Sequence, residues 1–111
     1  MKKKEELEAI EATLKKDGTR YNTIIAYLEE DNTEKTATFF LRKPDKSCRN
    51  LVEGILKKKG GLEAIFACIK NLDLKLGDDT NLLANNDYAL ASCEEAVVSM
   101  LEVQKAILKK N

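Results

Sequence analysis

The chain contains no histidine and no tryptophan, and it has one proline among its 111 residues. The absence of histidine removes the commonest general base and the commonest metal ligand of proteins. Catalysis would have to rest on acidic, lysine or cysteine side chains alone. We therefore expect a protein that is not an enzyme and that carries no cofactor.

Cysteine is also scarce, with Cys48, Cys68 and Cys93 spread evenly and no CxxC pair among them. Without paired cysteines or histidines a zinc site is not expected. Each cysteine falls near apolar positions of a helix-like segment, which predicts buried, reduced thiols. The acidic run at 78–81, DDTN, lacks the ligand spacing of a calcium loop, so no metal site is predicted there.

Long apolar runs and an excess of charge are missing as well. No apolar stretch approaches the ~18 residues of a membrane span, and acidic residues interrupt the basic start MKKKEELEAI before any signal-peptide core. Lysine plus arginine equals aspartate plus glutamate at 19 each, which argues against strong attraction to nucleic acids or membranes. We expect a cytoplasmic protein with no membrane partner and, if phage-encoded, one in the host cytoplasm.

The sequence contains helix-like and strand-like segments, and its length suits a single domain. Residues 3–16 are rich in good helix formers, with apolar residues at helical spacing and Gly18 as a stop. The apolar stripe consists of Leu7, Ile10 and Leu14. Such a narrow stripe predicts a single shallow contact, so residues 1–18 form a helix that is peripheral to the single domain 1–111.

Two strand-like runs, 20–29 and 35–43, flank the polar segment DNTEK and predict an antiparallel hairpin. Alternation divides the first run into an even-numbered apolar face and an odd-numbered face that also carries apolar residues. In the second run it separates Phe39 and Leu41 from Phe40. Because both faces are partly apolar, the hairpin needs cover on both sides, from helices or from a second copy.

Leu41-Arg42-Lys43-Pro44-Asp45 marks an abrupt change from strand to helix. Pro44 ends the strand, and Asp45 is placed to cap the following helix. The apolar stripe predicted for that helix comprises Cys48, Leu51, Val52, Ile55 and Leu56. Three lysines and two glycines at 57–61 close it, and a second amphipathic helix follows over 62–72.

Residues 73–86 are loop-like, and a long helix is predicted over about 87–109, capped by Asn85 or Asn86. Its apolar stripe continues, in a shifted register, to Ile107 and Leu108. The predicted class is α+β: an N-terminal helix, an antiparallel hairpin, and three helices packed on it.

Three landmarks occur in a fixed order: Leu41-Arg42-Lys43-Pro44-Asp45, then Gly77-Asp78-Asp79, then Asn86-Asp87-Tyr88 with Leu90. In this order and spacing the chain resembles small phage and prophage tail assembly chaperones and tail-module proteins. The resemblance covers about two thirds of the chain. The N-terminal helix is an addition, and the aromatic residue that such proteins often carry before the Gly-Asp loop is missing from 71–76.

The resemblance implies a protein-binding module that holds a helical tape-measure client until tail-tube subunits polymerise around it. An amphipathic client helix binds in an apolar groove between secondary-structure elements. The candidate partner-binding residues are Phe39, Phe40, Arg42, Lys43, Leu82 and Leu83. A weak homo-oligomer is compatible with this reading.

Three alternatives remain open. Arg42, Lys43, Lys46 and Arg49 gather near the proline, as in a nucleic-acid-binding regulator of a mobile element, although the neutral charge opposes this. A structural tail or head-completion protein would look the same in sequence. An enzyme would pair Cys93 with Glu94 and Glu95, or use Asp78 and Asp79; Cys93 lies on an apolar stripe, which keeps a thiol protonated.

Overall fold

A computed structural model describes the backbone of residues 1–110 and the side chains of residues 1–102. It has the predicted α+β class and element order. The elements are α1 (Lys4–Lys16), β1 (Asn22–Glu29), β2 (Asn32–Leu41), α2 (Lys46–Lys59), α3 (Gly61–Leu72), the short 3-10 helix η1 (Thr80–Leu83) and α4 (Asp87–Lys110). The predicted side-chain positions at Ile107 and Leu108 lie outside the described side chains.

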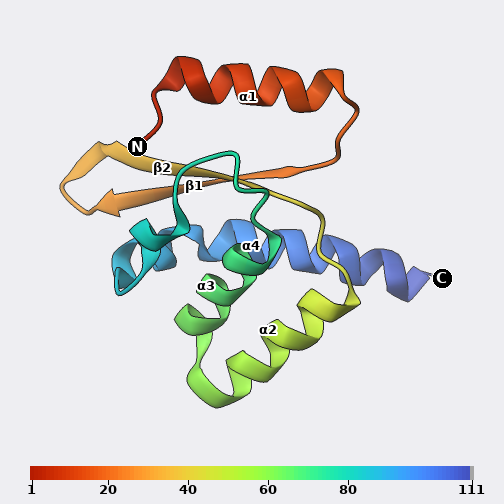
Figure 1. Ribbon diagram of the computed structural model, residues 1–111. Helices are drawn as coiled ribbons and strands as arrows, with labels where there is room; N and C mark the ends of the chain where they lie inside the picture. Colours follow the sequence, from red (N-terminus) through yellow and green to blue (C-terminus); the bar gives the residue numbers. More distant parts are fainter. Residues whose placement is uncertain (111) are drawn as a thin grey trace.

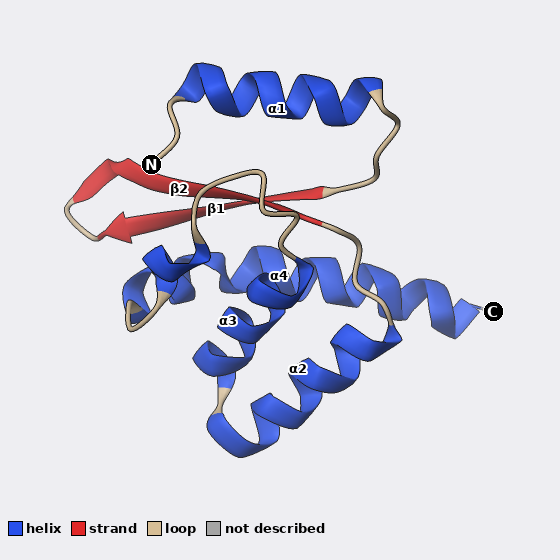
Figure 2. Cartoon of the chain, in the orientation of Figure 1, coloured by secondary structure: helices blue, strands red, loops and turns tan. Residues whose placement is uncertain are grey.

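The hairpin lies between two helical layers (Figure 1). Helix α1 lies over one face, which we call the outer face, and α2, α3 and α4 lie on the other, the inner face (Figure 2). Helices of the same chain therefore lie on both sides of the hairpin, one of the two possibilities that the sequence left open. Within the described part of the chain, no helix is both long and apolar enough to cross a membrane.

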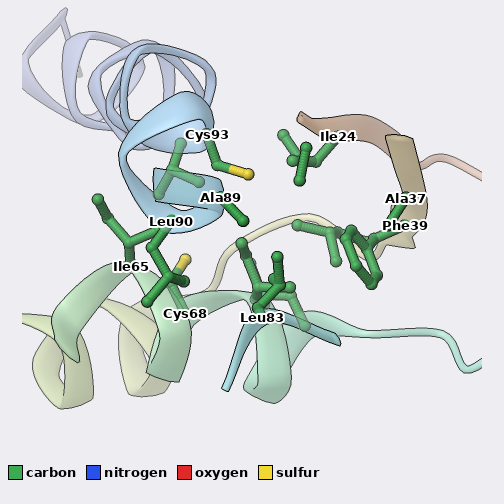
Figure 3. Close-up of a cluster of buried hydrophobic side chains, with 14 of the residues drawn as sticks. Ile24, Ala37, Phe39, Ile65, Cys68, Leu83, Ala89, Leu90 and Cys93 are labelled. Atoms are coloured by element: carbon green, nitrogen blue, oxygen red, sulfur yellow. The ribbon is translucent and has the colours of Figure 1, made fainter. Parts of the chain in front are cut away.

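The inner face carries the core. Ile24, Ala37 and Phe39 point from the strands toward Leu83 and toward side chains of α3 and α4 (Figure 3). Ala37 and Phe39 have no exposed surface and Ile24 retains 2%. All three cysteines are fully buried, as predicted, and they are free thiols.

The hairpin pairs Ile24 with Phe39 and Ala26 with Ala37, so the predicted division into faces is confirmed. The predicted turn was wrong in extent. Strand β2 begins at Asn32 rather than Lys35, and Glu29 pairs with Asn32 across a turn at residues 30 and 31. The polar side chains of this end remain in water, so they do not prevent the backbone from pairing.

Two predicted helix caps are confirmed. The Asp45 carboxylate accepts a hydrogen bond from the Cys48 amide at 2.8 Å, and the Asn86 side chain accepts one from the Ala89 amide at 3.0 Å. The apolar stripe predicted for α2 was too wide. Leu51 and Leu56 remain 41% and 51% exposed, because only the positions aligned with Cys48 and Val52 turn toward α3.

Candidate functional site

The chain itself closes part of one edge of the hairpin, the outer edge of β2. After α3, residues 72–78 return alongside β2. The Arg42 amide donates to the Leu72 carbonyl at 2.8 Å, the Leu74 amide donates to the Phe40 carbonyl at 2.9 Å, and the Asp78 amide donates to the Thr38 carbonyl at 2.8 Å. The loop thus satisfies the outward main-chain groups of β2, which protects an edge that would otherwise invite pairing.

Gly77 and Asp78 make this return possible. A Cβ atom on Gly77 would lie 2.3 Å from the Thr38 carbonyl oxygen, closer than real Cβ atoms come, so the approach requires glycine. Asp78 is 5% exposed. One of its carboxylate oxygens accepts the Thr38 amide at 2.8 Å, and the other accepts the Lys2 amide at 2.6 Å. One buried carboxylate therefore joins the loop, β2 and the N-terminus.

Helix α1 is fastened at its two ends. Its N-terminal end is held by the Lys2–Asp78 bond, and at its C-terminal end Leu14 is the one buried residue of the helix. There, the Tyr21 hydroxyl donates to Glu11 at 3.0 Å, and the Tyr21 ring stands edge-on to Phe40 at 6.0 Å. Removal from water raises the pKa of the Tyr21 hydroxyl, and the hydrogen bond to Glu11 raises this pKa further.

Between these ends α1 covers the outer face unequally. On β2, Phe40 is 1% exposed and Thr38 is 8% exposed. On β1, which presents its odd-numbered side chains to the same face, Ile25 is 52% exposed and Tyr27 is 43% exposed. Helix α1 and the 72–78 loop therefore cover the β2 half of the outer face and leave the β1 half open.

A groove of about 590 Å³ lies between α1 and this face. Its apolar lining residues are Met1, Leu7 on α1, Ile25 on β1 and Phe40 on β2, of which Phe40 is almost fully buried. Lys4, Glu8 and Glu34 line it as well, so the groove is amphipathic. A groove lined by both apolar and charged residues suits a polypeptide segment that has one apolar side.

The predicted partner-binding residues do not form one cluster. Phe39 and Leu83 have no exposed surface on the inner side, and Phe40 lies beneath α1. A partner would reach these three only after a covering element moved. Leu82 is 37% exposed on η1, away from the groove-lining residues.

The two basic candidates lie at the end of β2. Lys43 is exposed. The Arg42 guanidinium donates to Asp45 at 3.0 Å and to the Asn71 side chain at 3.1 Å. The basic group around the proline is therefore partly neutralised by contacts within the chain, which weakens its attraction for phosphates.

The cysteines have the properties of core residues. Burial raises the pKa of all three thiols, that of Cys68 to about 12. A thiol in this state is a poor nucleophile at neutral pH. Among the described side chains, no group of three or more acidic or cysteine residues is arranged to hold a metal ion.

Sequence reasoning missed the residues that build the groove. Ile25 was recognised only as one member of a strand face, and Gly77-Asp78 only as part of the loop-like segment 73–86. The one available signal was the second apolar face of the hairpin combined with the narrow stripe of the first helix. That stripe is too narrow to cover both strands.

Comparisons with protein-family models, with curated proteins and with solved structures found no match for this chain.

Proposed function

We propose that this protein is a non-catalytic protein-binding module that holds an amphipathic helix of a client against the open β1 half of the outer face. The resemblance to tail assembly chaperones suggests a tape-measure-like helical client. The observation that carries the proposal is the 52% exposure of Ile25 beside an apolar groove. Ile25 is not a single exposed residue, because Tyr27 on the same face is 43% exposed, and contiguous exposed apolar surface marks interaction sites.

Helix α1 indicates what kind of segment suits this face. It carries Leu7, Ile10 and Leu14 in a stripe, with charged residues on the remaining sides. A client helix with a similarly narrow stripe would lie beside α1, and its own charged residues would stay in water at the groove margins. This arrangement is the helix-in-groove mode of peptide recognition.

The resemblance predicts a long helical protein encoded beside this chain, and the test is co-expression with that protein, followed by co-purification at micromolar concentration. In Ile25→Asp a carboxylate would have to be buried against the client, so we expect affinity to fall by at least roughly tenfold. Leu56→Asp is the matched control, because Leu56 is 51% exposed on α2. Absence of a complex, or equal loss in both variants, would contradict the proposal.

A further inference from the structure

The outer edge of β1 offers unpaired main-chain groups. In the hairpin, Thr38 lies opposite Ile25, and Thr38 exchanges its main-chain bonds with Asp78 on the far side. In an antiparallel ladder such a residue belongs to a non-hydrogen-bonded pair, so the main-chain groups of Ile25 also point away from its partner strand. The same parity applies to Thr23 and Tyr27.

One of these outward groups is already used. The Tyr27 amide donates to the Ser92 hydroxyl of α4 at 3.0 Å. For Thr23 and Ile25, no main-chain partner outside the hairpin occurs among the described residues. Strand β1 contains no proline and no lysine, two residues that commonly protect an exposed strand edge. Its outward residues are instead β-branched or aromatic, which favours strand pairing.

We propose that β1 pairs antiparallel with β1 of a second copy of this chain, about a two-fold axis at Ile25. The bonds of this interface come from main-chain groups at the edge of β1, whereas the client groove is lined by side chains, and Ile25 takes part in both. In this register Ile25 lies opposite Ile25 of the second copy, and Thr23 lies opposite Tyr27. The two Ile25 residues then exchange both main-chain bonds. Because Ser92 already takes the Tyr27 amide, the outer pairs use the Tyr27 carbonyl and the Thr23 amide.

The side chains support this register. Ile25 and Tyr27 are the two large residues of β1 that the chain itself leaves open. Cross-strand pairing places Ile25 against its own copy and the Tyr27 ring against a Thr23 methyl group. The self-paired edge therefore covers apolar surface that α1 does not reach.

Charge complementarity selects the antiparallel direction. In the same register, Arg20 of one copy lies near Glu30 of the other copy. Arg20 precedes β1 and Glu30 follows it, and the two-fold axis repeats the contact. Both residues are exposed, and neither takes part in an ion pair among the described side chains. The chain has no net charge at pH 7, so long-range repulsion does not oppose association.

In the dimer the two hairpins form one continuous sheet with the strand order β2-β1-β1-β2. In each chain the loop bonds Thr38, Phe40 and Arg42 at the outer edge of β2, so further strands cannot pair along that part of the edge. An edge contact of this size buries less than a standard interface, so we expect a Kd on the order of 100 µM. The dimer also places the two open β1 halves side by side on one surface.

The decisive experiment is sedimentation equilibrium of the full chain, without client, from micromolar to millimolar concentration. We expect reversible dimerisation in the wild type. Arg20→Glu alone or Glu30→Arg alone sets like charges opposite each other, so each should weaken the dimer roughly tenfold. An equimolar mixture of the two variants restores opposite charges at both contacts and should dimerise as well as the wild type.

A second variant addresses the main-chain bonds. Ile25→Pro removes an amide that points away from β2, so the hairpin ladder keeps its own bonds while the dimer is lost. Leu56→Lys removes an equally exposed aliphatic residue from α2 and should leave the dimer unchanged. A wild type that stays monomeric at millimolar concentration, or a mixture of charge variants no better than either alone, would overturn the proposal.

Failure here is distinguishable from failure of the client proposal. The two charge variants leave every groove residue unchanged, so client binding by either variant is measured separately from its self-association. A wild type that binds client and yet stays monomeric at millimolar concentration refutes only the dimer.

Discussion

The two strands of the hairpin share a register but differ in how the chain treats their outer edges. Strand β2 is bonded along its outer edge to residues 72–78, and its outer-face side chains Thr38 and Phe40 are buried. The main chain of strand β1 makes two side-chain bonds, from the Tyr27 amide to Ser92 and from the Asn86 side chain to the Leu28 carbonyl, and Ile25 is left half exposed. The difference in cover arises from where α1 and the loop lie. The uncovered half is where we place both proposed contacts.

The largest expected effect concerns the closed edge. Gly77→Ala places a Cβ atom within 2.3 Å of the Thr38 carbonyl oxygen, so the loop must move away from β2. We expect the free energy of unfolding to fall on the order of 2–3 kcal/mol, as for overpacked sites. Thermal or denaturant unfolding measures this.

Gly54→Ala is the matched control for that change. A Cβ atom on Gly54 meets nothing within 4 Å, and the position lies inside α2. Replacing glycine by alanine in a helix should raise the free energy of unfolding by about 0.5–1 kcal/mol. Equal effects of the two alanine substitutions would mean that the loop is not held against β2.

A smaller effect is expected at Asp78. Asp78→Asn keeps one acceptor oxygen but replaces the other with a donor, so either Thr38 or Lys2 loses its acceptor. We expect the variant to be less stable by about 1–2 kcal/mol, the cost of a buried group left unpaired. Amide exchange should accelerate at Thr38 and at the start of α1. Unchanged exchange at both places would show that Asp78 does not fasten α1.

A pH-dependent effect is expected at the cap that follows β2. The bond from the Cys48 amide, and then the contact with Arg42, lower the pKa of Asp45. Because the folded-state pKa lies below the ordinary value near ~3.9, the carboxylate stabilises the fold above that pH. Its contribution is lost as the pH falls through the lowered pKa.

Asp45→Ala should therefore lower the melting temperature at pH 7, and the difference from the wild type should shrink on acidification below about 4. Melting curves of both proteins across this range provide the test. A difference that stays constant down to the most acidic pH would mean that the carboxylate charge plays no part.

The smallest stability effect is expected on the open half. Ile25→Thr keeps a β-branched side chain at a position that is 52% exposed, so we expect the free energy of unfolding to change by less than about 0.5 kcal/mol. Chemical denaturation of a dilute sample measures it. A large loss would show that Ile25 is covered in solution and would remove the basis of both proposals.

Much of the fold was predictable because it depends on short-range patterns. Alternation assigned the faces of β1, Pro44-Asp45 placed the start of α2, and Asn86 capped α4 as expected. These features require only neighbouring residues. The burial of the three cysteines followed from helical spacing in the same way.

The edge closure was not predictable, because it depends on contacts between distant residues. Thr38 and Asp78 are 40 residues apart, and nothing in Gly77-Asp78 distinguishes a turn from a segment that pairs with a strand. The position of α1 was equally hidden, since its stripe indicates a contact but not which strand it covers. The exposure of Ile25 is a consequence of both.

Amide hydrogen exchange in a dilute, client-free sample tests the central claim most directly. The account predicts slow exchange at Thr38, Arg42 and Asp78, whose amides are bonded across the closed edge, and fast exchange at Thr23 and Ile25. Raising the protein concentration should slow the second group alone. Protection of Thr23 and Ile25 equal to that of Thr38 in the dilute sample would show that β1 has no open edge.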